Sequence, residues 1–335
     1  MRGRGPALVP GRGELSQTVV DALRGGRPPR YSPDTVARAD PWGEDLQLAL
    51  YLLYELHYRG FHEAADEREW DPDLLRLRRI LETAMLDALH DELRGGPDSV
   101  AEAFGPLLVE SAGPGGSASH HLERRGTLWQ LREYAALRSL YHLKEADPHL
   151  WVVPRLTGRA KAAMVAVEYD EFGAGRAEDV HARLFADLMA DLGLDPAYGR
   201  YLKHAPAPLL ATVNLMSLFG LHRSLRGALV GHFACVEVTS SPGSRRLLHA
   251  MRRCGAGPAA ERFYAEHVEA DAVHEQVVRR EVVGGLLADE PRLEADAAFG
   301  CAATVLLEER LDAHVTAAWK RNESALRLPL PPPAG

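Results

Sequence analysis

Residues 263–274 read Phe-Tyr-Ala-Glu-His-Val-Glu-Ala-Asp-Ala-Val-His, which places His267, Asp271 and His274 at helical spacing. On an α-helix, side chains at positions i, i+4 and i+7 lie within about 60° of one another, so the two imidazoles and the carboxylate share one face. This pattern predicts one wall of a metal site. The alternative is a polar helix face, because a chain with 15 histidines meets this spacing by chance about once in twenty.

The helical pattern continues on both sides of this segment. Apolar residues recur at helical spacing over most of the chain, and β-branched runs of period two are almost absent. The expected helices cover residues 44–58, 72–93, 97–110, 127–146, 159–171, 177–192, 208–239, 244–253, 259–289 and 296–321. We therefore predict an all-α protein, a helical bundle with a smaller helical N-terminal section packed on it.

Composition divides the chain into four parts. Gly, Pro and Arg are frequent in the first forty residues, which predicts an irregular tail. Prolines near the C-terminus cannot continue a helix and predict a loose end. The predicted parts are an N-terminal tail (1–40), an N-terminal helical section (41–115), a bundle (116–325) and a Pro-rich C-terminal tail (326–335).

Charge and hydropathy disfavour several classes of protein. The 39 Lys and Arg against 47 Asp and Glu give a net charge of −8, which disfavours nucleic acid as the main partner. No run approaches the roughly 18 apolar residues needed to span a membrane, and residues 1–13 lack the apolar core of a secretory signal. We therefore expect a cytoplasmic protein without a membrane partner.

The three cysteines, Cys235, Cys254 and Cys301, lie far apart and form no CxxC pair. Reduced buried thiols are expected, rather than disulfides or an iron–sulfur cluster. Any metal must then be held by histidine and carboxylate, which selects for iron, manganese or zinc.

Three further segments offer carboxylate or imidazole ligands. Glu178-Asp-Val-His181 has the i, i+3 spacing that places both side chains together on a helix, as in di-iron carboxylate bundles. A carboxylate at a helix start is also favoured by the helix dipole alone. Glu237 closes a long apolar segment and needs a partner, for which a metal, an Arg or solvent would each serve. Glu145, just before Pro148, would by itself be surface charge.

The order Glu, ExxH, Glu, HxxxDxxH resembles the haem-oxygenase-like diiron oxidase and oxygenase family, known broadly as iron-containing redox enzymes. Residues 141–151 (YHLKEADPHLW), 168–175 (EYDEFGAG) and 263–271 (FYAEHVEAD) support the resemblance, which covers about 127–321. It implies a haem-oxygenase-like helical bundle that binds two irons and no haem. The N-terminal third matches no motif.

The resemblance also implies a ligand set, whose members would be both metal-binding and catalytic. One iron would be held by Glu145, His181 and His274, the other by Glu237, His267 and Asp271, with Glu178 bridging. Four ionised carboxylates balance the charge of two Fe(II) ions, and such an oxygen-rich site with three imidazoles suits iron.

Two alternatives concern residues near this set. Glu168, Asp170 and Glu171 form an acidic cluster before Gly173, and one of them could be a ligand instead of Glu178. His142, one turn before Glu145, could orient its carboxylate. Glu55 and His57 are metal-capable, but the i, i+2 spacing sends them to different helix sides, so we expect packing or interface roles.

The implied function is an O2-dependent oxidation of a small organic molecule by two Fe(II)/Fe(III) ions, with O2 as co-substrate. N-oxygenation, oxidative C–C cleavage, desaturation and decarboxylation all occur in such families, and the sequence does not choose among them. An external electron donor is allowed, as is a homodimer formed through the apolar helix at 46–54. The alternatives are a ferritin-like ferroxidase, which commonly carries two ExxH elements, and a metal-free helical scaffold.

Overall fold

The computed structural model describes residues 5–109 and 116–330, without the side chains of residues 33 and 271–273. Within those ranges every regular element is helical, so the all-α prediction is confirmed. No described helix combines the length and apolar character needed to cross a membrane.

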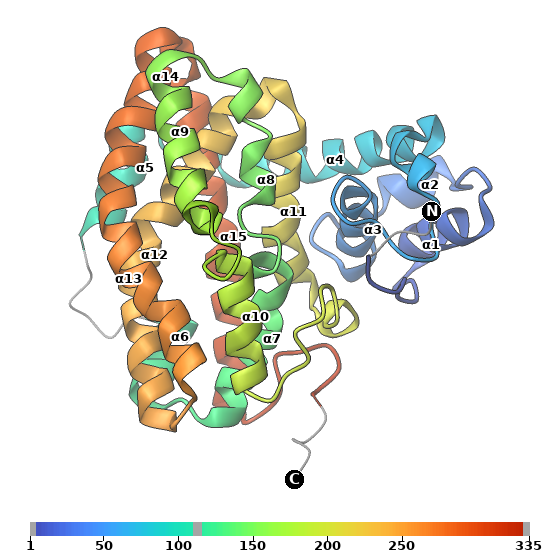
Figure 1. Cartoon of the computed structure of the whole chain (residues 1–335). Coiled ribbons are helices and arrows are strands. Elements are labelled where there is room, and N and C mark those ends of the chain that lie inside the picture. The colour runs from blue at the N-terminus through green and yellow to red at the C-terminus, as the bar shows by residue number, and fades with distance from the viewer. Residues whose placement is uncertain (1–4, 110–115, 331–335) are drawn as a thin grey trace.

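The larger part of the chain is a helical bundle (Figure 1). Its long helices are α7 (Leu128–His142), α9 (Gly158–Glu171), α10 (His181–Asp191), α11 (Ala207–Leu221), α12 (Arg226–Cys254), α13 (Pro258–Val277) and α15 (Glu294–Lys320). Helix α12 packs on both α13 and α15. A Cβ atom on Gly231 or Gly300 would lie 1.9 Å from a backbone oxygen of the facing helix, so glycine permits the close approach of α12 and α15.

Short elements precede these helices in the chain or connect them. They are α5 (Val100–Phe104), α6 (Ala118–Arg125), α8 (Asp147–Leu150) and α14 (Gly284–Asp289), with 3-10 turns η1 (Asp66–Trp70), η2 (Gly105–Leu108), η3 (Val153–Arg155), η4 (Gly173–Gly175), η5 (Leu202–His204), η6 (Arg223–Leu225) and η8 (Pro291–Leu293). A π-helical segment, η7 (Val278–Val283), joins α13 to α14 where one helix was predicted.

Helix α12 corrects two predicted boundaries. The chain breaks after Leu221, inside the predicted helix 208–239, and then runs as one helix past Pro242, where a break was predicted. A proline removes one backbone donor, and the packing of α12 against α13 and α15 outweighs that loss.

Four helices form the N-terminal section, seen beside α11 in Figure 1: α1 (Glu14–Gly25), α2 (Pro33–Ala37), α3 (Glu44–Glu55) and α4 (Pro72–Glu92). The irregular tail predicted for residues 1–40 is wrong for α1, because Leu15, Val19 and Leu23 form a buried stripe that packs on α3. Abundant Gly, Pro and Arg on either side masked this amphipathic segment.

Buried residues correct two further expectations, one about a dimer surface and one about the C-terminal tail. Residues 46–54 of α3 are all buried within the chain, against α1 and α11, and are not available as a dimer surface. At the C-terminal end, Leu326 is buried and Arg327 N donates to His204 O at 2.9 Å. The start of the predicted loose tail is therefore held against the bundle, whereas the side chains of residues 327–329 are exposed.

Candidate metal centre

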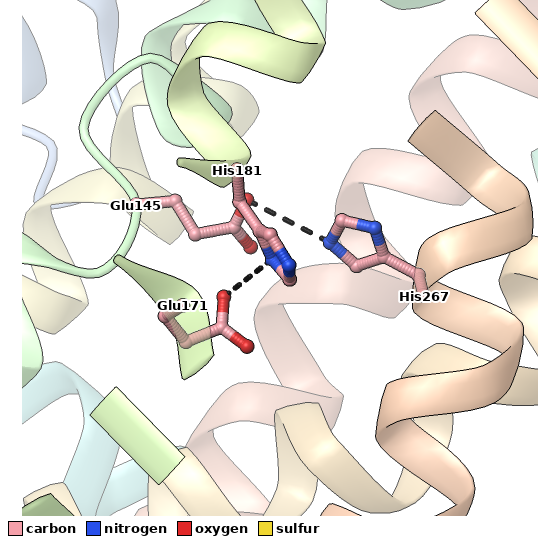
Figure 2. Close-up of side chains that lie close together, drawn as sticks. All are labelled: Glu145, Glu171, His181 and His267. Atoms are coloured by element: carbon pink, nitrogen blue, oxygen red, sulfur yellow. Dashed lines mark ion pairs between the residues drawn. The ribbon is translucent and has the colours of Figure 1, made fainter. Parts of the chain in front are cut away.

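Among the residues whose side chains the structure describes, six buried carboxylates and imidazoles converge inside the bundle, each exposing 8% of its surface or less. They form two groups whose ligand atoms lie within 4.8 Å of one another: Glu145, Glu171, His181 and His267 in the first, and Glu171, Glu237 and His274 in the second. Figure 2 shows the first group, with all four side chains directed at a common centre. Glu171 belongs to both groups, so they are adjacent.

These six residues come from five separate segments. Glu145 lies in the turn between α7 and α8. Glu171 is the last residue of α9, and His181 is the first residue of α10. Glu237 lies within α12, and α13 carries His267 and His274. These segments lie far apart in the sequence, so it is the tertiary fold that brings the six side chains together.

A left-handed turn joins α9 to α10. Gly173, Ala174 and Gly175 have φ of 71°, 51° and 84°, values that glycine adopts without strain. A Cβ atom at Gly173 would lie 2.7 Å from the backbone of Asp179 and Val180. This tight reversal brings His181 Nδ1 to 2.7 Å from Glu171 Oε2.

Hydrogen bonds orient the first group. His267 Nδ1 donates to Phe263 O at 2.8 Å, which fixes the tautomer with the lone pair on Nε2, the atom 3.9 Å from Glu145 Oε2. His142 Nδ1 donates to Glu145 Oε2 at 2.9 Å, so His142 contacts this carboxylate as its spacing predicted. Neutral imidazoles held by a second partner are typical of metal ligands.

The second group centres on His274. Its Nδ1 lies 3.4 Å from Glu237 Oε2 and 3.7 Å from Glu171 Oε1. On the other side of the ring, Nε2 lies 3.2 Å from Asp170 Oδ2. Asp170 therefore orients this imidazole from outside the group.

Two of the three carboxyl groups of the centre, Glu171 and Glu237, bind protons unusually tightly, and the third does not. Burial raises the pKa of Glu171 to about 8, with a further contribution from the charge of Glu145. Burial likewise raises the pKa of Glu237 to about 7, although His274 opposes the shift. For Glu145, burial would raise the pKa, but the hydrogen bond and charge of His142 outweigh it and lower the pKa to about 2.

Glu168, one turn before Glu171 on α9, adds a fourth buried carboxyl group. Neither of its oxygens has a hydrogen-bond partner among the described residues. Burial, followed by the negative charge of Glu171, raises its pKa to about 9. Gathered carboxylates with raised pKa values are a site that a divalent cation would stabilise, and oxygen with imidazole nitrogen is a donor set that suits iron.

The structure brings together five of the seven predicted ligands: Glu145, His181, Glu237, His267 and His274. The side chain of Asp271 lies outside the described residues. Glu178 is not brought to the centre: α10 begins at His181, not at 177, so Glu178 lies exposed in the preceding turn and helical spacing does not pair it with His181.

Glu171, weighed as an alternative ligand, occupies the shared position instead. The grouping of the histidines also differs from the one that the resemblance implied. His267 lies with Glu145 and His181, whereas His274 lies with Glu237. The sequence feature that indicated Glu171 was its place in the acidic cluster before Gly173.

Two cavities reach the centre, and α13 contributes to the walls of both. The first, here the bundle pocket, has a volume of about 320 Å³ and lies between α7, α11, α12, α13 and α15. Its wall includes Tyr141, His142, His267, Thr212, Leu215, Met216, Leu247 and the ion-paired Arg138 and Glu308. The second, here the turn pocket, is about 390 Å³ and is lined by His181, His274, Asp170, Asp179, Arg176 and Arg262.

Comparison with known proteins agrees with this geometry. No curated protein matches the chain. A family model described as iron-containing redox enzyme matches residues 132–309, more than half of the chain, and all six residues of the two groups lie within that span. The chain belongs to the iron-containing redox enzyme family.

Proposed function

We propose that this protein is a non-haem diiron enzyme that uses O2 to oxidise a small organic molecule. The observation that carries the proposal is Glu171, one buried carboxylate common to two adjacent ligand groups. A carboxylate has two oxygens and can hold two cations at once, which is the arrangement that two-metal sites use. A mononuclear site would need only the first group.

The donor set supports iron in both positions. The first group offers two carboxylates and two imidazoles, and the second offers two carboxylates and one imidazole. When bound, two Fe(II) ions supply two of the electrons with which O2 is reduced, and the substrate or an external donor supplies the rest. The six buried side chains of the two groups would hold these ions at fixed positions, away from bulk water.

The bundle pocket is the proposed substrate site. Its volume of about 320 Å³ lies at the lower end of the range for small-molecule pockets, roughly 300–1,000 Å³. Leu215, Met216 and Leu247 supply apolar contact, while the buried hydroxyl of Tyr264 has no hydrogen-bond partner among the described residues. This hydroxyl would orient a polar group of the substrate beside His267.

Anaerobic titration with Fe(II), followed by exposure to O2, tests the proposal. The expected result is two ions per chain and O2 consumption that accelerates when an organic substrate is present. O2 consumption driven by Fe(II) alone, with no organic product from a broad panel, would instead identify a ferroxidase. A folded protein that takes up no stoichiometric iron would contradict both functions.

A further inference from the structure

A buried ion pair joins the N-terminal section to the turn that carries Glu145. Lys144 Nζ lies 2.6 Å from Glu55 Oε2, and the two side chains expose 1% and 0% of their surface. Glu55 is the last residue of α3, and Lys144 directly precedes Glu145. The pair therefore links a section outside the matched family span to a residue of the metal centre.

Aromatic side chains enclose this pair. Tyr198 Oη donates to both oxygens of Glu55, at 2.8 and 3.0 Å. Lys144 Nζ lies 4.9 Å from the ring centre of Tyr51 and 4.3 Å from that of Tyr58. Because a buried charge is strongly disfavoured without its partner, these contacts confine the ammonium group to one position.

The backbone of the same turn is held from the same side. Arg59 Nη2 donates to Leu143 O at 3.4 Å, and its guanidinium lies 4.0 Å from the ring centre of Tyr198. The next side chain, Glu145, is directed into the centre, towards His267, as Figure 2 shows. Consecutive residues thus connect the N-terminal section to a metal ligand.

We propose that Glu55 is a positioning residue for the metal centre, which acts through Lys144 to fix the turn from which Glu145 reaches the first ligand group. The inference rests on the proposed function in requiring a metal at that group. On this proposal, the N-terminal section helps to position a metal ligand of the bundle. Outer contacts that orient metal ligands typically change metal affinity by about 10- to 100-fold when they are removed.

The test is anaerobic equilibrium dialysis of the full chain against Fe(II) alone. Glu55→Gln preserves the shape of the side chain but leaves Lys144 without its counter-charge. The expected result is that one Fe(II) ion binds roughly 10- to 100-fold more weakly, while the other keeps its wild-type affinity. Glu237 belongs to the second group only. Glu237→Gln should therefore weaken the ion of that group, which shows which of the two measured affinities belongs to which group.

A double-mutant cycle with Lys144→Met tests whether the two residues act as one link. The double variant should bind the affected ion no more weakly than the weaker single variant, because both substitutions break the same connection. Tyr198→Phe removes only a hydrogen bond to Glu55. It should weaken the same ion by a smaller factor, and it keeps the test available if Glu55→Gln does not fold.

Glu133→Gln is the matched control. Glu133 is a buried carboxylate of the bundle that accepts from Trp319 Nε1 at 2.8 Å and from Ala325 N at 2.7 Å. This substitution should lower the unfolding midpoint and leave Fe(II) affinity unchanged. Wild-type affinity for both ions in Glu55→Gln and Tyr198→Phe, or equal weakening of both ions in Glu55→Gln and Glu133→Gln, would overturn the inference. A wild-type chain that binds no Fe(II) would instead remove the proposed function.

Discussion

His181 Nδ1 lies 2.7 Å from Glu171 Oε2, across a turn that separates the end of one helix from the start of the next. This contact, and not a pairing along one helix, supplies the carboxylate partner of His181. It also places Glu171 where both ligand groups can use it.

Substitution of this shared carboxylate should affect both metal ions. We expect Glu171→Gln to weaken each Fe(II) ion by at least the roughly 10- to 100-fold that an outer-shell loss costs, because one ligand is removed from both groups. Glu178→Gln, an exposed position on the adjoining turn, is the matched comparison and should have the smaller effect. The measurement is Fe(II) affinity by anaerobic dialysis. A larger loss in Glu178→Gln would restore Glu178 as the bridging ligand.

The two histidines of α13 should each control one ion. His267→Ala removes a ligand from the first group only, and His274→Ala removes one from the second only. Each variant should therefore retain one tightly bound Fe(II) instead of two, as measured by iron content after gel filtration. His249→Ala, at an exposed position on α12, serves as the control and should keep both ions. Loss of both ions in either single variant would mean that the ions bind only as a pair.

Stability of the metal-free protein should fall as pH rises. The pKa of Glu168 is raised from 4.5 in the unfolded chain to about 9 by burial, so the folded state holds a proton that the unfolded state releases. Its contribution is complete below pH 4.5 and is lost progressively towards pH 9, with a slope of at most about 1.4 kcal/mol per pH unit. Urea unfolding between pH 6 and 8.5 measures this loss together with the smaller losses from Glu171 and Glu237, whose pKa values are raised to about 8 and about 7.

Glu168→Gln provides the control for that prediction. The amide has nearly the same shape and cannot ionise, so the variant should show a flatter dependence of the unfolding midpoint on pH. Fe(II) should also flatten the dependence in the wild-type chain, because a cation compensates the ionised carboxylates. Identical pH profiles for wild type and variant would contradict the assignment of the titration to Glu168.

Filling the bundle pocket should separate turnover from metal binding. Thr212 is half-buried on α11 and lines this pocket, so Thr212→Phe should reduce substrate-dependent O2 consumption by an order of magnitude or more while both Fe(II) ions still bind. The added ring should also lower the free energy of unfolding by about 1–3 kcal/mol if it overfills its surroundings. Thr83→Phe, at an exposed position on α4, controls for the added ring. Unaltered turnover in Thr212→Phe would place the substrate elsewhere.

The class of fold could be predicted because apolar residues fall at helical spacing along the chain and period-two runs of β-branched residues are almost absent. The predicted helices were wrong where a local sequence signal, a proline or a flank rich in Gly, Pro and Arg, opposed the tertiary packing. Helix α12 passes through Pro242 because the helices on either side hold it. Helix α1 was missed because its buried stripe, Leu15, Val19 and Leu23, lies between segments rich in Gly, Pro and Arg.

The candidate site was predictable where ligands repeat along one helix and not where they meet across a turn. His267 and His274 could be paired from spacing alone, since α13 is one continuous helix between them. The choice between Glu171 and Glu178 depends on where α10 begins, and that start follows from the left-handed conformation of residues 173–175. Two acidic residues seven positions apart give no sequence signal that decides it.

The bundle pocket and the turn pocket have one further consequence. His267 lines the first, whereas His181 and His274 line the second. With the proposed metal centre and substrate site, the metal would exchange with the medium by one route and organic molecules by the other. A small hydrophilic chelator entering beside Arg176 and Arg262 should withdraw iron at the same rate whether or not the bundle pocket is filled.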